Sequence, residues 1–289
     1  MTQSRLTDEI KQTAAGLRAQ LPADFRPEVL LILGSGLGGL ADEVDAAARV
    51  PYAEIPGWAV STVVGHTGTL HAGTLAGVPV LVMQGRLHLY EGYSPTAITL
   101  PVRTARALGA STLIVTNAAG ALNPDYRPGD LMLIADHINL AGWGGANPLL
   151  GPNDESLGPR FPAMNPAYDP ELTSLALNVA GPNSGLRRGT YVMLPGPNFE
   201  TNAELRALRI LGGDAVGMST VPEVLVARHG GMKVLGISCI TNMAVADWEE
   251  PILHDQVLDT AKEAGPRLAG LVMGILAQLG TAEHVLPRS

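Results

Sequence analysis

Short apolar runs alternate with amphipathic segments along nearly the whole chain. Runs of strand length occur at residues 29–33, 78–83, 112–116, 131–134, 190–194 and 234–240, with shorter strand-like stretches within 51–77 and at 214–218. Apolar positions at helical spacing predict helices at about residues 6–21, 95–108, 171–180, 202–211 and 254–279, and shorter ones after residues 39 and 219. This alternation predicts an α/β fold with a mostly parallel mixed central sheet flanked by helices.

Local signals set several of these boundaries. Ser94 and Pro95 suit the N-cap and first position of a helix, and Thr201 with Glu204 forms a capping box. Residues 141–170 form a long loop rich in Gly, Pro and Asn, which is usually a functional feature. There is no internal repeat or shift in composition. We therefore expect a single domain over residues 1–289, with an N-terminal helix within 1–24 and a tail at 280–289.

Composition narrows the classes of function. The 289 residues are 46% hydrophobic and 16% charged, with a net charge of −8 and no basic patch, so a nucleic-acid partner is not expected. The N-terminus does not resemble a signal peptide, and no apolar run reaches the roughly 18 to 20 residues of a membrane span. The lone cysteine, Cys239, fits a reducing compartment and is better read as a small buried hydrophobe than as a nucleophile. We expect a cytoplasmic protein without membrane contact.

Five motifs of polar residues and glycine, not all with both, follow five of the predicted strands. They begin after residues 33, 83, 116, 194 and 240. In open α/β sheets, ligands bind beyond the carboxyl ends of the strands. The sequence therefore predicts that these motifs share one site.

The first motif, residues 34–39, has two interpretations. Gly34, Gly36 and Gly39 match the dinucleotide pattern G-x-G-x-x-G, with Glu54 about 20 residues further on, which would suit a nucleotide-dependent oxidoreductase. However, Glu54 lies among prolines and not at the end of a buried strand. A phosphate cradle fits better, because glycines let backbone N–H groups approach an anion and Ser35 adds a hydroxyl. A plain glycine turn remains the alternative.

The second and third motifs offer further groups for an anion. Arg86, His88 and Tyr90 alternate after a buried strand, and an Arg with a His can donate several hydrogen bonds to an oxyanion. The alternative is a surface arginine and a structural histidine. Residues 117–120 provide either a backbone N–H for the ligand or close packing. His66 is as easily a turn residue as a neighbour of the ligand.

The motif at residues 196–204 is suited to a flat heterocycle. Phe199 offers a ring for stacking and Glu200 an acceptor for N–H groups, and the capping box leaves Glu200 free for another role. Asn242 carries both a donor and an acceptor, although a turn role is common for asparagine. Three further candidate residues have simpler structural interpretations. Met218 is explained as a core residue, Ser219 as a helix N-cap and His254 as the start of the last helix.

Taken together, these motifs resemble those of the trimeric purine nucleoside phosphorylases. The resemblance rests on residues 34–38, 85–93, 116–120, 136–139, 151–154, 196–201 and 217–220, and it extends from about residue 25 to 278 in the family's order. Residues 243–245 are more like those of bacterial members. The resemblance implies reversible phosphorolysis of purine (deoxy)ribonucleosides to the free base and (deoxy)ribose 1-phosphate. It implies a homotrimer, no metal and no cofactor, with inorganic phosphate as a co-substrate.

The same resemblance implies a role for each matching position. Phosphate would be bound by Ser35, His66, Arg86, His88, the backbone at Ala118 and Ser219. Ribose would contact Tyr90, Met218 and His254, together with Phe161 reaching in from a neighbouring subunit. The purine would meet Phe199, Glu200, Val216 and Asn242. Catalysis would fall to His88, Glu200, Asn242 and His254.

The chemistry of these residues favours 6-oxopurines such as inosine and guanosine. Glu200 is an acceptor, which suits a ring bearing N1–H, and Asn242 suits the N7/O6 edge. Methylthioadenosine phosphorylases are the nearest alternative, but they typically have Asp where Asn242 stands and lack the Phe199-Glu200 pair. A purine- or phosphate-binding module without activity is a third possibility, beside the oxidoreductase.

Overall fold

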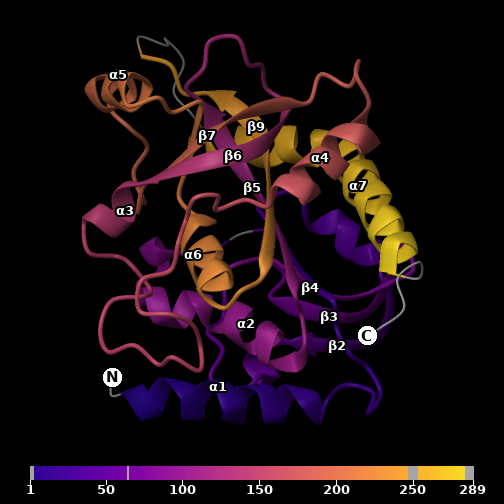
Figure 1. Cartoon of the computed structure of the whole chain (residues 1–289). Coiled ribbons are helices and arrows are strands. Elements are labelled where there is room, and N and C mark those ends of the chain that lie inside the picture. The colour runs from indigo at the N-terminus through magenta and orange to yellow at the C-terminus, as the bar shows by residue number, and fades with distance from the viewer. Residues whose placement is uncertain (1–2, 64, 247–252, 284–289) are drawn as a thin grey trace.

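The computed structural model describes residues 3–63, 65–246 and 253–283. In Figure 1 a central sheet carries helices on its sides and ends. The strands are β1 (Val29–Leu33), β2 (Asp45–Pro51), β3 (Thr69–Leu75), β4 (Val78–Gln84), β5 (Thr112–Ala121), β6 (Leu131–Asn139), β7 (Arg187–Met193), β8 (Ala215–Gly217) and β9 (Lys233–Met243). The helices are α1 (Gln3–Arg18), α2 (Pro95–Leu108), α3 (Leu140–Trp143), α4 (Pro170–Ala180), α5 (Asn202–Ile210), α6 (Val221–His229) and α7 (His254–Glu283), with 3-10 turns η1 (Gly38–Glu43), η2 (Tyr52–Glu54) and η3 (Leu89–Glu91).

The sheet is mixed, as expected. Its strand order is β2-β3-β4-β1-β5-β8-β7-β6-β9, and β9 also pairs with β5. In the described part of the chain, five pairings are parallel and four are antiparallel. Because β9 returns to β5, the strands β5, β8, β7, β6 and β9 close into a ring. The α/β single-domain prediction is confirmed.

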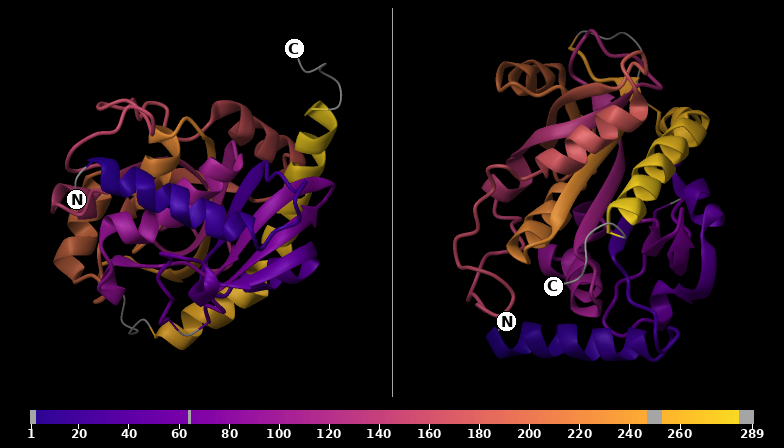
Figure 2. Two further views of the ribbon diagram at one scale, coloured as in Figure 1. Left: turned by 90° about the horizontal axis from the view of Figure 1, so that it is seen from below. Right: turned by 45° about the vertical axis from the view of Figure 1, so that its right-hand side comes forward.

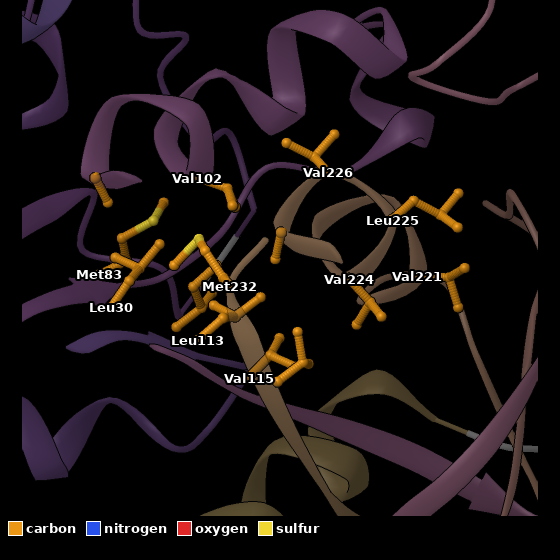
Figure 3. Packing of buried hydrophobic residues seen from close by; sticks show 14 of the residues in the cluster. Leu30, Met83, Val102, Leu113, Val115, Val221, Val224, Leu225, Val226 and Met232 are labelled. Atoms are coloured by element: carbon orange, nitrogen blue, oxygen red, sulfur yellow. The ribbon is translucent and has the colours of Figure 1, made fainter. Parts of the chain in front are cut away.

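The two faces of the sheet are buried under different helices. Along β1, Leu30 and Ile32 belong to one apolar cluster and Leu31 to another, because successive strand residues point to opposite faces. Figure 3 shows the first cluster, where Val102 of α2 and Val224 of α6 lie over the sheet. The second contains much of α7, which runs along the side of the sheet in Figure 2. No helix in the described ranges is both long and apolar enough to cross a membrane.

Several strands extend beyond their apolar runs. β5 continues to Ala121 and β9 to Met243, so residues 117–120 and Asn242 lie within strands, whereas the sequence predicted them to follow strands. Polar residues are accommodated there because β5 and β9 pair with each other over their whole length. Two further boundaries differ: α7 continues past residue 279 to Glu283, into the predicted tail, and the predicted loop 141–170 contains most of α3.

The β5–β9 pairing contains a β-bulge next to the polar residues. Ala119 pairs with Ile240 and Gly120 pairs with Asn242, which leaves Thr241 as an extra residue in β9. A bulge breaks the strict alternation of side chains and often re-aims them near a functional site. As a result, two consecutive residues of β9 face the same pocket, described next.

Candidate active site

One pocket brings together residues from all five motifs. It lies where β1 and β4 end, beside β8 and at the polar positions of β5 and β9. The predicted residues that line it are Ser35, Arg86, His88, Tyr90, Ala118, Phe199, Glu200, Val216, Met218, Ser219 and Asn242. The expectation that these segments converge is therefore met by the geometry, while the role of each residue stays a prediction.

Arg86 is the most constrained side chain of the pocket. It is only 1% exposed, and its Nε donates to Glu223 Oε1 at 3.1 Å. Its Nη1 donates to the Thr116 carbonyl at 2.5 Å and lies 3.2 Å from Ser219 Oγ. Its Nη2 is buried and has no partner among the described residues. The guanidinium is thus fixed on one side and keeps N–H groups for a ligand on the other, an arrangement suited to an oxyanion.

His66 does not line the pocket, but it contacts two residues that do. Its Nδ1 lies 2.9 Å from the Arg86 carbonyl oxygen and its Nε2 lies 3.0 Å from Ser35 Oγ. Burial, helped by the nearby His88, lowers the pKa of His66 to about 4, so the ring is neutral at pH 7. With its proton on Nδ1, the ring donates to the Arg86 carbonyl and accepts from the Ser35 hydroxyl. His66 therefore orients Ser35.

His88 and Tyr90 stack at one wall of the pocket. Their ring centroids are 4.5 Å apart with an interplanar angle of 16°. The chain is extended only as far as His88, after which η3 begins, so the expected simple alternation stops there. Glu91 Oε1 lies 3.1 Å from His88 Nδ1. Burial lowers the pKa of His88, against the opposing effect of Glu91. A neutral His88 then donates from Nδ1 to Glu91 and presents Nε2 as an acceptor.

Ser219 is held by a strained turn. Thr220 has φ +77° and ψ −53°, a conformation that a β-branched residue rarely adopts. Val221 N–H donates to the Ser219 carbonyl at 2.8 Å, which makes a γ-turn with Thr220 at its centre. Asn117 Nδ2 donates to Thr220 Oγ1 at 2.9 Å. This turn sets Ser219 against Arg86 at the start of α6.

The other end of the pocket carries the ring and the carboxylate. Thr201 and Glu204 form the predicted capping box, with Thr201 N–H donating to Glu204 Oε2 at 2.8 Å, so Glu200 is not used as the cap. Burial raises the pKa of Glu200. Phe199 remains 41% exposed at the rim. Thr241 Oγ1 donates to Asn242 Oδ1 at 2.9 Å, which turns the Asn242 Nδ2 donor toward other partners.

Besides His66, two predicted residues do not line the pocket of this chain. His254 is the first residue of α7 and is exposed, whereas Val257, about one turn further along the helix, lines the pocket. Phe161 is 88% exposed in the connection between α3 and α4. Residues 247–252, immediately before α7, lie outside the described residues.

Other contributors were missed by the sequence reasoning. Asn117 and Thr241 line the pocket, and Glu223 fixes Arg86 through a buried ion pair. Asn117 lies in the third motif, from which the sequence predicts only a backbone N–H contact. Glu223 had a usable signal, since a carboxylate within the buried apolar run 221–227 needs a buried partner.

Neither a metal-binding cluster nor a reactive thiol is found among the described residues. They contain no group of three or more His, Cys, Asp or Glu side chains that could hold a metal ion. Cys239 is fully buried, and burial raises its pKa to about 12. Its thiol is therefore protonated at neutral pH, which agrees with a packing role.

Comparison with known proteins identifies the family. The model of the phosphorylase superfamily matches residues 28–277. Purine nucleoside phosphorylase 1 of Geobacillus stearothermophilus is 53% identical over 272 residues, covering 93% of this chain and 97% of that protein. The purine nucleoside phosphorylase of Bos taurus is 52% identical over 264 residues, covering 90% and 91%. The crystal structure of the Schistosoma mansoni enzyme in complex with adenosine matches with a TM-score of 0.89 and 41% identity, covering 98% of each chain. This chain belongs to the purine nucleoside phosphorylase family of enzymes.

Proposed function

We propose that the chain catalyses the reversible phosphorolysis of purine ribonucleosides and deoxyribonucleosides. The observation that carries this is the arrangement of Arg86. Its buried guanidinium has an unpartnered nitrogen at one end of a pocket whose other end carries Glu200 and Asn242. An anion and a heterocycle therefore fit side by side in one pocket. The names of the relatives support the same activity.

In the proposed reaction inorganic phosphate is the nucleophile. A phosphate oxygen forms a bond to C1′ while the bond from C1′ to the purine nitrogen breaks, through an oxocarbenium-like state. Arg86, Ser35, Ser219 and the backbone N–H of Ala118 would bind the phosphate. The enzyme's task is to position the two substrates and to stabilise the charge that moves onto the base. We infer no cofactor beyond this co-substrate.

The protonation of His88 is expected to depend on phosphate. In the free enzyme the neutral ring offers an acceptor nitrogen to the pocket. A bound anion beside it raises its pKa by electrostatic attraction. Phosphate binding would then bring a proton onto His88, which becomes a donor to the anion.

We propose a preference for 6-oxopurines. Ionised Glu200 accepts from N1–H, and Asn242 Nδ2 donates at the N7 side. Adenosine lacks N1–H, and an unpaired buried polar group costs about 1–3 kcal/mol, or roughly tenfold or more in kcat/KM. The Schistosoma mansoni relative was crystallised with adenosine, so a 6-aminopurine nucleoside enters the site of that relative. The proposed preference is therefore a difference in kcat/KM between 6-oxopurine nucleosides and adenosine, and not an exclusion of adenosine from the pocket.

The closest alternative activity is that of a methylthioadenosine phosphorylase. Asn242 and the Phe199-Glu200 pair both argue against it. We also infer a bacterial-like member from residues 243–245, although the bacterial and mammalian relatives have almost the same identity to this chain. We propose a cytoplasmic homotrimer in which the exposed Phe161 completes a neighbouring site.

The first test is release of hypoxanthine from inosine, followed with and without inorganic phosphate. We expect release only with phosphate, together with formation of ribose 1-phosphate. Guanosine and adenosine, each with and without phosphate, complete the substrate set. Cleavage at an equal rate without phosphate would indicate a hydrolase and contradict the proposal, and binding of guanine without turnover would indicate a binding module.

The base contact is tested by Asn242→Asp. The new carboxylate accepts from an exocyclic amine, so the ratio of kcat/KM for adenosine to that for inosine should rise, by roughly tenfold on the value of one hydrogen bond to a charged group. Steady-state kinetics on both nucleosides give the ratio. An equal loss on both substrates would contradict the assigned orientation of the base.

A further inference from the structure

A second cavity lies beneath the connection between α3 and α4, against α2 and the C-terminal end of α6. It is lined by Arg103 of α2, His229 of α6, Asn153 of the connection, and Ser94 and Thr96 at the start of α2. Figure 1 shows these segments together near the N-terminal end of α1. None of these residues has a part in the proposed reaction.

Arg103 is the unusual feature of this cavity. Arg103 is only 7% exposed, and its Nε is buried without a hydrogen-bond partner in the described structure. Burial lowers the pKa of Arg103 to about 10, which still leaves the guanidinium protonated at neutral pH. Arg86, the other deeply buried arginine discussed above, has Glu223 as its counterion. A buried cation without such a partner is strongly unfavourable, so Arg103 points to a missing anion.

Nearby carboxylates of the same chain are engaged elsewhere. Asp154 also lines the cavity, but it accepts hydrogen bonds from Thr7 and Ser156. Glu155 accepts from Asn153 Nδ2 at 2.8 Å. Neither forms an ion pair with Arg103 in the described part of the chain.

The opposite wall of the cavity is held rigidly in place. His229 Nε2 lies 3.2 Å from Asn153 Oδ1, while Asn153 Nδ2 donates to the Gly158 carbonyl at 3.0 Å. A Cβ atom at Gly158 would come within 2.0 Å of the His229 carbonyl oxygen, so the connection packs directly on α6. The pKa of His229 is lowered by burial and then by the charge of Arg103. An anion between them would offset this repulsion.

We propose that this cavity is a second anion-binding site, in which the Arg103 guanidinium binds an oxyanion. Ser94 Oγ accepts from Ala97 N–H at 3.2 Å and keeps its own proton to donate, and Thr96 supplies another hydroxyl. The ligand chemistry is that of a carboxylate or a phosphate. Its source is either a free small anion or an acidic side chain of a second copy of this chain.

Binding of inorganic phosphate to the intact protein separates the two sources. Equilibrium dialysis with labelled phosphate is carried out on the wild type, on Arg103→Gln and on the matched control Arg106→Gln. Arg106 lies one turn along on the same helix but is exposed and donates to the Gly230 carbonyl. If the anion is free, we expect about two phosphates per chain for the wild type and the control, and about one for Arg103→Gln.

If the anion belongs to a second copy, phosphate stoichiometry is the same in all three proteins. Sedimentation then shows a dissociation constant of the assembly that is about tenfold or more higher for Arg103→Gln than for the control. Unchanged stoichiometry together with unchanged association overturns the proposal. If the anion is free, Arg103→Met guards against a misfolded variant: without added anions its Tm should be no lower than that of the wild type, because an unpaired buried charge has been removed. A much lower Tm together with unchanged association would indicate a purely structural Arg103 and also overturn the proposal.

Discussion

Burial sets the charge state of the side chains around the pocket. His66 and His88 are both held toward the neutral form, whereas Glu200 is held toward the protonated one. At mildly acidic pH, the lowered pKa values of the two histidines reduce the number of bound protons, whereas the raised pKa of Glu200 increases it. They therefore lead to separate predictions for stability and for activity.

His66 should weaken the fold in acid. Its pKa is about 4 in the folded chain and near 6.5 when unfolded, so between these values the unfolded chain binds a proton that the folded chain does not. Stability that is present above pH 6.5 is thus lost as the pH falls toward 4. From pH 7 to pH 4 the wild type should lose about 3 kcal/mol more unfolding free energy than His66→Gln. Urea denaturation across this range measures the difference, and parallel curves would contradict the buried neutral histidine.

Protonation of Glu200 should cause the fall of activity at acidic pH, which is the acid limb of the pH profile. Its carboxylate must be ionised to accept from the purine N1–H, and its raised pKa means that ionisation is lost at a higher pH than for an ordinary glutamate. We expect kcat/KM for inosine to fall as the pH decreases through that pKa. Glu200→Gln should have a lower kcat/KM without this limb. An unchanged limb in the variant would assign the titration to another group.

At the scale of elements, the start of α6 depends on the γ-turn at Thr220. Thr220→Val keeps the β-branched shape but removes the hydroxyl that binds Asn117 and Ser219. We expect KM for phosphate to rise about tenfold, with KM for inosine nearly unchanged, because Ser219 loses its support. Thr99→Val is a matched control, since Thr99 is also buried and, within the part of the chain that the structure describes, its hydroxyl donates only to carbonyl groups of α2. An equal rise in both Michaelis constants would argue against a role specific to phosphate.

The elements also show what a pattern of apolar residues can predict. β1 coincides with its apolar run because residue 34 starts a turn and every strand position is buried. β5, β6 and β9 run further because neighbouring strands in the ring continue to pair with polar residues such as Asn117 and Asp136. Pairing between distant segments is a tertiary effect that local hydrophobicity does not encode. The order of the strands is likewise absent from the pattern.

The sequence predicts those parts of the candidate site whose motifs directly follow predicted strands. Ser35 and Arg86 are predicted in this way, whereas the phosphate role of Ser219 is implied by the family resemblance alone. The ion pair of Arg86 with Glu223 joins residues far apart in the chain, so only the fold reveals it. His254 was placed by resemblance alone, and α7 instead brings Val257 to the pocket.

At the scale of the whole molecule, Phe161 makes the proposed assembly testable. Phe161→Ala and Glu200→Gln should each have reduced activity. After the two variants are mixed under conditions that exchange subunits, some sites combine an intact Phe161 from one chain with an intact Glu200 from the other. We expect the mixture to exceed the average of its components. Ile210→Ala, another exposed apolar residue at 85%, serves as the control and should be fully active. A strictly additive mixture would contradict shared sites.

The bulge at Thr241 constrains how this chain can evolve. β9 must contain one residue more than β5 across the pocket, so the number of residues in this stretch matters as much as their identity. An insertion or deletion upstream in β9 would shift Asn242 to the other face of the sheet. Substrate preference can therefore drift by substitution at position 242, whereas changes in length are confined to connections such as the one between α3 and α4.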